Sequence, residues 1–227
     1  MAVRTDGRTA FVVIDVQNDF VTGSLGTPEA VEMLPRLLEK MRGFEGAVLM
    51  TLDTHGEDYA DTQEGRFLPV SHCVRGTEGW RFPPEVEALR ESLGARVYEK
   101  PTFGSTSLVS ELKRLYDEAE LESVELVGLC TDICVISNAL MIKAAMPELP
   151  VYVDAARCAG ASAPESATRP RWRPRSTPGH PGSGGVYNLS TFTPEFDATP
   201  IHISCKMCIN TAITSYFGVI LCATSGA

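Results

Sequence analysis

The stretch VELVGLCTDICVISN, residues 124–138, decides the fold of this chain. Residues 124–129 are too few and too rich in β-branched side chains for a helix, so they predict a buried strand. Residues 133–145 then carry apolar side chains at helical spacing and predict a helix. The stretch therefore indicates a strand that passes through a sharp turn into a helix.

The same alternation of strand and helix patterns runs through the first two thirds of the chain. Strands are predicted at residues 10–14, 46–52, 95–98, 123–129 and 151–153. Helices are predicted at residues 28–42, 84–93, 107–119 and 133–145. Such alternation indicates right-handed βαβ units, so the predicted fold is a doubly wound, mostly parallel sheet in a three-layer α/β/α domain.

Polar side chains stand just after the predicted strands, where open α/β sheets bind their ligands. They are Asp15, Asp53, His55, Lys100, Cys134 and Asp154. Asp154 is interpreted as a cap or a solvated edge residue. The others bring a carboxylate, an ammonium and a thiol to one edge, and these groups are the parts needed for covalent catalysis.

Cys134 lies at the start of the predicted helix that follows the strand at 123–129. Thr131 or Asp132 can cap this helix through a side-chain oxygen. The positive end of the helix dipole would then favour the thiolate of Cys134 over the thiol. The alternative is a buried structural cysteine, a role that Cys130 could equally fill.

Asp53, His55 and His72 form a second candidate cluster, because a carboxylate and two imidazoles suit zinc, iron or manganese. Three protein ligands would leave coordination positions open for water or substrate. The alternative is that the histidines only cap turns in a loop rich in Gly and Asp.

The composition narrows the class of partner. The net charge of −9 over 227 residues argues against a nucleic-acid surface, so a small molecule is the expected partner. The N-terminus lacks a signal-peptide pattern, which predicts a cytoplasmic protein whose seven cysteines are thiols. The oligomeric state is left open, a homo-oligomer included.

Four segments in the same order resemble the isochorismatase-like cysteine hydrolases, and within them the nicotinamidases. The segments are IDVQNDF (14–20), DTH (53–55) with HCVRGTEGW (72–80), EKPTFGST (99–106) and GLCTDICV (128–135). The resemblance spans residues 8–161 and implies a six-stranded parallel sheet, a catalytic triad of Asp15, Lys100 and Cys134, and a cis peptide bond between Leu129 and Cys130. It also implies a divalent metal, zinc before iron or manganese, at Asp53, His55 and His72.

The resemblance implies an amidohydrolase that acts on a small amide, above all nicotinamide, through a thioester on Cys134. The backbone N–H groups of Cys130 and Cys134 would form the oxyanion hole. The metal would position the substrate ring. Phe20 and Leu129 are the expected substrate-binding residues, although an isolated phenylalanine such as Phe20 also fits the core.

Two departures from the nicotinamidase pattern affect the substrate and the metal. Pro69 stands where nicotinamidases commonly have an aromatic residue, which leaves open a related hydrolase of a vinyl ether or another small amide. Asp61 stands where some members have a further metal histidine, so Asp61 or Glu64 is expected as an oxygen ligand or as a residue that binds water near the metal.

Beyond residue 162 the sequence changes character. The stretch SAPESATRPRWRPRSTPGHPGSGG (162–185) has a proline every few residues, a spacing that helices do not tolerate. We predict a hydrolase domain at residues 1–162 and an atypical tail at 163–227 that derives from a frameshift or a fusion, with 176–185 as a disordered linker. A non-catalytic metal-binding product is therefore a third interpretation.

Within this tail, residues 207–227 approach membrane-spanning length, but their Asn, Thr, Ser and Gly favour a strand at the sheet edge instead. The C-x-x-C spacing of Cys205 and Cys208 comes without a second ligand pair, and the RPRWRPR run is short. We therefore expect neither a membrane nor a nucleic-acid partner.

Overall fold

Six strands form one sheet in the order β3-β2-β1-β4-β5-β6, within the residues that the computed structural model describes, 7–161 and 186–188. The strands are β1 (Thr9–Ile14), β2 (Ala47–Asp53), β3 (Arg96–Lys100), β4 (Ser123–Leu129), β5 (Val151–Ala159) and β6 (Val186–Asn188). β1 to β5 pair in parallel, and β6 runs antiparallel to β5. The predicted doubly wound, mostly parallel sheet is confirmed.

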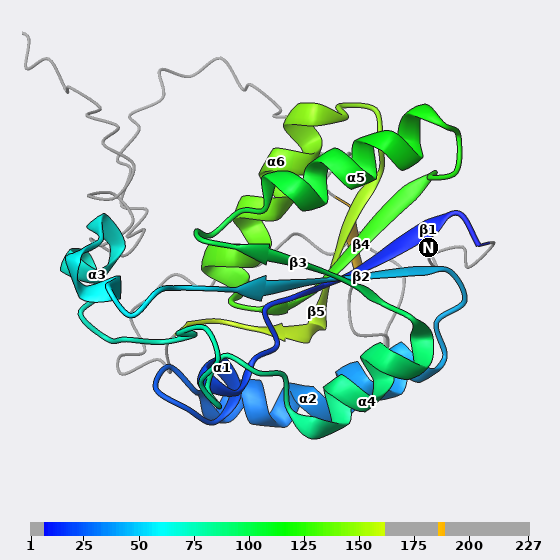
Figure 1. Ribbon diagram of the computed structural model, residues 1–227. Helices are drawn as coiled ribbons and strands as arrows, with labels where there is room; N and C mark the ends of the chain where they lie inside the picture. Colours follow the sequence, from blue (N-terminus) through cyan, green and yellow to red (C-terminus); the bar gives the residue numbers. More distant parts are fainter. Residues whose placement is uncertain (1–6, 162–185, 189–227) are drawn as a thin grey trace, which may run out of the picture.

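Helices cover both faces of this sheet (Figure 1). One face carries α2 (Pro28–Arg42) and α4 (Pro84–Leu93), and the other carries α5 (Thr106–Asp117) and α6 (Ile136–Ala145). The shorter elements are α1 (Asn18–Val21), η1 (Tyr59–Asp61), α3 (Gln63–Phe67) and the π-helical turn η2 (Thr131–Val135). The three predicted layers are therefore present, and α3 lies beyond the sheet edge at which the parallel strands end (Figure 1).

The central strand β1 explains why its sequence reads as a continuous apolar run. All its residues are buried, and alternate side chains point to opposite faces of the sheet. Phe11 and Val13 belong to the core under α2 and α4, whereas Val12 and Ile14 belong to the core under α5 and α6. Burial of each such side chain contributes roughly 1.5–3 kcal/mol to stability.

Helix ends follow the local signals in the sequence. Thr27 caps α2 by accepting a hydrogen bond of 3.1 Å from the Ala30 N–H, and Pro28 occupies the first helical position. α4 ends at Gly94, whose φ of 61° is a left-handed conformation that suits glycine. The predicted bounds of these two helices are confirmed.

β5 is longer than predicted and carries the main correction to the sequence interpretation. Asp154 lies inside this strand and is completely buried, so the interpretation as a cap or solvated edge residue is wrong. Its Oδ2 lies 2.7 Å from Lys40 Nζ and 3.0 Å from Arg157 Nη1. A pattern of three apolar residues followed by an acid resembles a strand end, but the two cations allow the strand to continue.

The sixth strand differs from the expectation of a fully parallel sheet. A parallel strand needs a crossover that usually contains a helix. β6 pairs instead antiparallel with residues 152–154 of β5.

Apart from β6, the predictions for the tail, including the linker at 176–185, Cys205 and Cys208 and the stretch 207–227, lie outside the described residues. The division at residue 162 stays a prediction. Among the described residues, no helix has the length and apolar character needed to cross a membrane.

Candidate active site

The carboxyl ends of four parallel strands bring the candidate residues together. Asp15 follows β1, Asp53 and Lys100 are the last residues of β2 and β3, and Cys134 lies in η2 after β4. Asp53 and Lys100 are direct neighbours in the β2–β3 register. The prediction that these four side chains lie at one edge of the sheet is therefore confirmed.

Lys100 is the centre of this arrangement. Its Nζ lies 2.7 Å from Asp15 Oδ2 and 3.0 Å from Asp53 Oδ1. The same ammonium donates a hydrogen bond of 3.6 Å to Cys134 Sγ. Only 1% of Lys100 is exposed, so these contacts lie out of bulk water and are screened little by salt.

Burial strongly affects the ionisation of Asp15 and Lys100. It raises the pKa of Asp15, an effect that the Lys100 charge offsets only in part. Burial would also lower the pKa of Lys100, but Asp15, Cys134 and Asp53 together hold it well above its usual range. The lysine is therefore charged, and the Asp15 carboxyl is a weaker acid than an ordinary aspartate.

The main chain at Asp15 is held in an unusual conformation. Its φ is 46°, in the left-handed region that few residues other than glycine adopt. Thr51 on β2 helps to hold this conformation, because its Oγ1 donates to Asp15 Oδ1 at 2.7 Å and accepts from the Asp15 N–H at 3.2 Å. Strain of this kind is common at functional sites.

Cys134 sits in the π-helical turn η2, before α6 rather than in its first turn. The predicted caps are wrong: Cys130 occupies the N-cap position of η2, and Asp132 Oδ1 accepts from the N–H of Ala161 beyond β5. Asp132 is thus used in a long-range contact that local sequence does not reveal. The peptide bond between Leu129 and Cys130 is cis, as the resemblance implies.

The thiol of Cys134 does not ionise as readily as the helix dipole suggests. The residue is 4% exposed, and burial raises its pKa well above the usual value, against the lowering effect of Lys100. Burial therefore opposes the effect that the sequence ascribes to the helix dipole. A base is required to take the proton, and the geometry offers the carboxylate of Asp15, which contacts the same Lys100 ammonium as Cys134.

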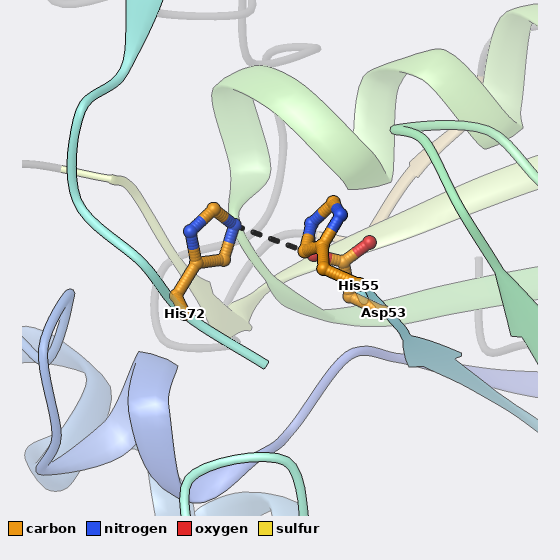
Figure 2. A group of neighbouring side chains, drawn as sticks. All are labelled: Asp53, His55 and His72. Carbon is orange, nitrogen blue, oxygen red and sulfur yellow. Dashed lines mark hydrogen bonds and ion pairs between the residues drawn. The ribbon is translucent and has the colours of Figure 1, made fainter. Parts of the chain in front are cut away.

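Asp53, His55 and His72 form a compact cluster in which one ligand atom from each lies within 4.8 Å of the others. His55 Nε2 is 3.0 Å and His72 Nε2 is 3.5 Å from Asp53 Oδ2. Figure 2 shows the two imidazole rings and the carboxylate turned toward one another. His72 Nδ1 lies 2.8 Å from the Val70 carbonyl; donation there leaves the Nε2 lone pair directed at the cluster.

Glu64 completes this cluster, and Asp61 does not. Glu64 Oε1 lies 3.7 Å from Nε2 of both His55 and His72 and is buried, whereas Asp61 is exposed on η1. Of the two expected oxygen donors, the structure therefore brings only Glu64 to the site. Two imidazole nitrogens and the Asp53 carboxylate, with the Glu64 carboxylate beside both imidazoles, are a donor set that suits a divalent metal ion.

Asp53 joins the two clusters through its two carboxylate oxygens. Oδ1 contacts Lys100, and Oδ2 faces His55 and His72. Burial alone would raise the pKa of Asp53, but the Lys100 charge and the two histidines hold it far below its ordinary range. The carboxylate is therefore ionised, as a metal ligand must be.

Three supporting residues were not singled out from the sequence. Gln17 is fully buried; its Oε1 accepts from the Asp53 N–H at 2.8 Å, and its Nε2 donates to the carbonyls of Asp53 and Trp80. Thr51 holds Asp15, and Asn138 contacts the turn of Cys134. The available signal was a polar residue within an otherwise apolar run, as in AVLMTLD and ISNALMIKAA.

The two expected substrate-binding residues lie in the core under α2 and α4. Phe20 is 6% exposed, and its ring centroid lies 5.5 Å from that of His72. Leu129 is completely buried at the end of β4. Phe20 therefore borders the metal cluster, whereas contact of Leu129 with a substrate stays a prediction.

Comparisons with known proteins agree with this fold. The family model of the isochorismatase domain matches residues 9–169. The nicotinamidase of Schizosaccharomyces pombe is 27% identical over 171 residues, which cover 58% of this chain and 74% of that protein. The crystal structure of a Pyrococcus horikoshii pyrazinamidase in complex with zinc has 25% identity and a TM-score of 0.55, and the match covers 68% of this chain and 88% of that one. An N-carbamoylsarcosine amidase from Thermoplasma acidophilum has 26% identity and a TM-score of 0.54, with 69% and 87% covered.

Proposed function

This chain belongs to the isochorismatase family and is a hydrolase of amide carbon–nitrogen bonds, and we propose that it converts nicotinamide to nicotinate and ammonia. The observation that carries the proposal is the position of Lys100 Nζ, within 2.7 Å of Asp15 Oδ2 and 3.6 Å of Cys134 Sγ. A base, a charge partner and a thiol in contact are the groups that covalent amide hydrolysis requires. The nicotinamidase relative supports the choice of substrate.

In the first half of the proposed reaction Asp15 takes the proton of the Cys134 thiol as the sulfur attacks the amide carbonyl. The negative charge moves to the carbonyl oxygen, where the backbone N–H groups of Cys130 and Cys134 would stabilise it. The carbon–nitrogen bond then breaks. The amine takes the proton from Asp15 and leaves as ammonia, so the acyl group remains on sulfur as a thioester.

In the second half Asp15 takes a proton from water, and the resulting hydroxide attacks the thioester carbonyl. The carbon–sulfur bond breaks, and the proton held by Asp15 returns to the Cys134 sulfur as the acid leaves. Lys100 orients Asp15 and offsets negative charge on both catalytic groups through contacts of 2.7 and 3.6 Å. These roles for the three residues are part of the proposal.

We propose zinc as the metal, held by Asp53, His55, His72 and Glu64, whose donor atoms suit this ion. When bound, the metal supplies a fixed positive centre that orients the substrate. Phe20 and the buried ring of Tyr59 flank the histidines, with Tyr59 centred 5.0 Å from His72. These rings would border an aromatic substrate.

The assignment is tested by incubating the purified, metal-loaded full chain with a panel of amides. Nicotinamide, pyrazinamide and N-carbamoylsarcosine are compared by ammonia release and by chromatography of the acid product. We expect nicotinamide to have the highest kcat/KM. Faster release from N-carbamoylsarcosine would replace the substrate assignment, and release from none of the panel would favour a non-catalytic metal-binding product.

A second candidate is a related hydrolase of another small amide or a vinyl ether. Pro69 replaces the aromatic residue expected in nicotinamidases, and it is exposed, as is Phe67 at 47%. The aromatic wall on this side of the metal cluster is therefore weaker. The amidase of Thermoplasma acidophilum shows that a similar fold also serves a different amide. A small-molecule substrate is proposed in either case; a cytoplasmic location, the absence of nucleic-acid and membrane partners, and the oligomeric state stay predictions.

The pH dependence of kcat/KM should report the base. Protonated Asp15 cannot accept the thiol proton, so we expect activity to fall about tenfold per pH unit below the pKa of Asp15. Burial places this acid limb above the ordinary value of 3.8. The raised pKa of Cys134 keeps the thiol protonated through neutral pH, so the alkaline limb should lie above about pH 9. Kinetics across pH with nicotinamide measure both limbs.

Thr51→Val provides the control for the pH profile. The variant removes the hydroxyl that donates to Asp15 Oδ1 and so removes a bond that favours the charged carboxylate. The acid limb should therefore move to higher pH. An acid limb that Thr51→Val leaves in place would mean that another group controls it.

The metal ligands can be separated by a matched pair of variants. Glu64→Gln keeps the shape of the side chain but removes the negative charge near His55 and His72, so metal affinity should fall about 10- to 100-fold. Asp61→Asn, three residues earlier and exposed, should leave the affinity unchanged. Competition with a chromophoric chelator measures both. Equal losses in the two variants would contradict the assignment of Glu64.

A further inference from the structure

Asn138 is a buried amide on α6 that connects two parts of the site. The residue is completely buried, although asparagine is a poor helix former. Its Nδ2 donates to the Cys134 carbonyl at 2.8 Å and to the Phe103 carbonyl at 3.1 Å. Its Oδ1 accepts from the Ser105 N–H at 2.9 Å. Both donors and the acceptor are used, so the side chain is fixed in one orientation.

The two connected segments carry the two residues that must meet. One is η2, where the carbonyl held by Asn138 belongs to Cys134 itself. The other is the loop 101–105, which begins directly after Lys100 at the end of β3. Ser105 also caps α5 by accepting from the Leu108 N–H at 3.2 Å. Asn138 therefore anchors the loop at the point where α5 begins.

The loop also packs tightly against the next turn of α6. A Cβ atom added at Gly104 would come within 2.2 Å of Met141 Sδ, so a larger residue there would require the Met141 side chain to move. Met141 lies three residues after Asn138 and therefore on the same side of the helix. The loop is thus held on α6 by the hydrogen bonds of Asn138 and also lies close to Met141.

We propose that Asn138 is a positioning residue that keeps Lys100 and Cys134 at a fixed separation by tying together the main chain that carries each of them. The role rests on the proposed cysteine hydrolase function. At 3.6 Å between Lys100 Nζ and Cys134 Sγ, a small shift of either segment changes the interaction of ammonium and sulfur steeply. A purely structural asparagine would contribute stability without affecting that distance.

The test compares Asn138→Val with Asn138→Thr in the metal-loaded full chain. The two replacements have nearly the same shape and both lose the loop partners. Threonine can still donate from its hydroxyl to the carbonyl four residues earlier, which is that of Cys134. Ile142→Val, a buried change on the same helix, is the control for a loss of stability that leaves the bridge intact.

The readout is the rate at which iodoacetate modifies Cys134, divided by the rate for neutral iodoacetamide, followed on the Cys134 peptide by mass spectrometry. A change in exposure or in the thiolate fraction of Cys134 affects both reagents alike, whereas a retreat of the Lys100 charge additionally slows the anion, so the ratio reports the position of that charge. We expect the ratio to fall about three- to tenfold in Asn138→Val and less in Asn138→Thr, with kcat following the same order and KM nearly constant. Ile142→Val should leave the ratio unchanged.

Any other result overturns the proposal. If Asn138→Val keeps the wild-type ratio, Asn138 does not position Lys100 relative to Cys134. If the Thr and Val variants have equal ratios, the hydrogen bond to the Cys134 carbonyl does not contribute. If Asn138→Thr keeps the wild-type ratio, the bonds from Asn138 to the loop 101–105 do not contribute. If the ratio falls in Ile142→Val as well, the effect comes from lost stability. The alkylation needs no substrate. If the ratios follow the expected order but no ammonia is released from nicotinamide, only the assignment of nicotinamide as the substrate is refuted.

Discussion

Replacing Cys134 by alanine is expected to lower ammonia release by a factor on the order of 10⁴ or more, because the covalent route loses its nucleophile. The fold should survive the change. Cys134 packs in the core under α5 and α6, and the replacement removes one sulfur atom at a cost on the order of 1 kcal/mol. Ammonia release under saturating nicotinamide, together with a urea unfolding curve, measures both effects.

Cys130→Ala is the matched control, since Cys130 is also buried, at 5% exposure, and lies in the same turn region. Its proposed contribution is a backbone N–H, which alanine retains. Activity within a few-fold of wild type is expected. If Cys130→Ala lost as much activity as Cys134→Ala, or if Cys134→Ala remained active, Cys134 would not be the nucleophile.

Lys100→Met is expected to remove catalysis and to cost about 3 to 5 kcal/mol of stability. Methionine fills much of the same volume, but Asp15 and Asp53 would lose their shared buried cation. The pKa of the Asp15 carboxyl, already raised by burial, would rise further because the Lys100 charge that lowers it is gone. A protonated Asp15 cannot act as the base, so kcat should fall by roughly 10³-fold or more.

Lys40→Met separates the loss of stability from the loss of catalysis. Lys40 also bridges two buried carboxylates, Glu125 and Asp154, but it does so between α2 and the sheet. Its replacement should lower the urea midpoint while kcat, measured where the variant is folded, stays near wild type. A Lys100→Met variant that is folded and active would contradict the role of the lysine, as would a Lys40→Met variant that is folded but inactive.

The fold was predictable because its signals are local. The apolar run of β1 indicates a strand buried on both faces, and the caps at Thr27 and Gly94 mark helix ends that the structure confirms. α1, η1 and α3 contain four, three and five residues, too few to produce a periodic pattern. They were accordingly not indicated by the sequence.

The site was predictable as a set of residues because parallel strands end at one edge of the sheet. That rule places Asp15, Lys100 and Cys134 together without knowledge of any contact. Two predictions failed for a common reason. Asp132 was expected to cap a helix but binds Ala161, and Asp154 was expected at a solvated edge but is buried between cations. In both cases a residue distant in sequence determines what the carboxylate does.

The sequence by itself determined the order of strands and helices, the edge at which the polar side chains gather and the chemical types present there. Only the tertiary structure decided that Glu64 rather than Asp61 joins the two histidines, that Lys100 serves both clusters, and that Asn138 bridges two segments. It also decided that burial raises the pKa of the Cys134 thiol more than the nearby Lys100 charge lowers it. Local patterns report propensity and periodicity, whereas burial and pairing depend on residues that only folding brings together.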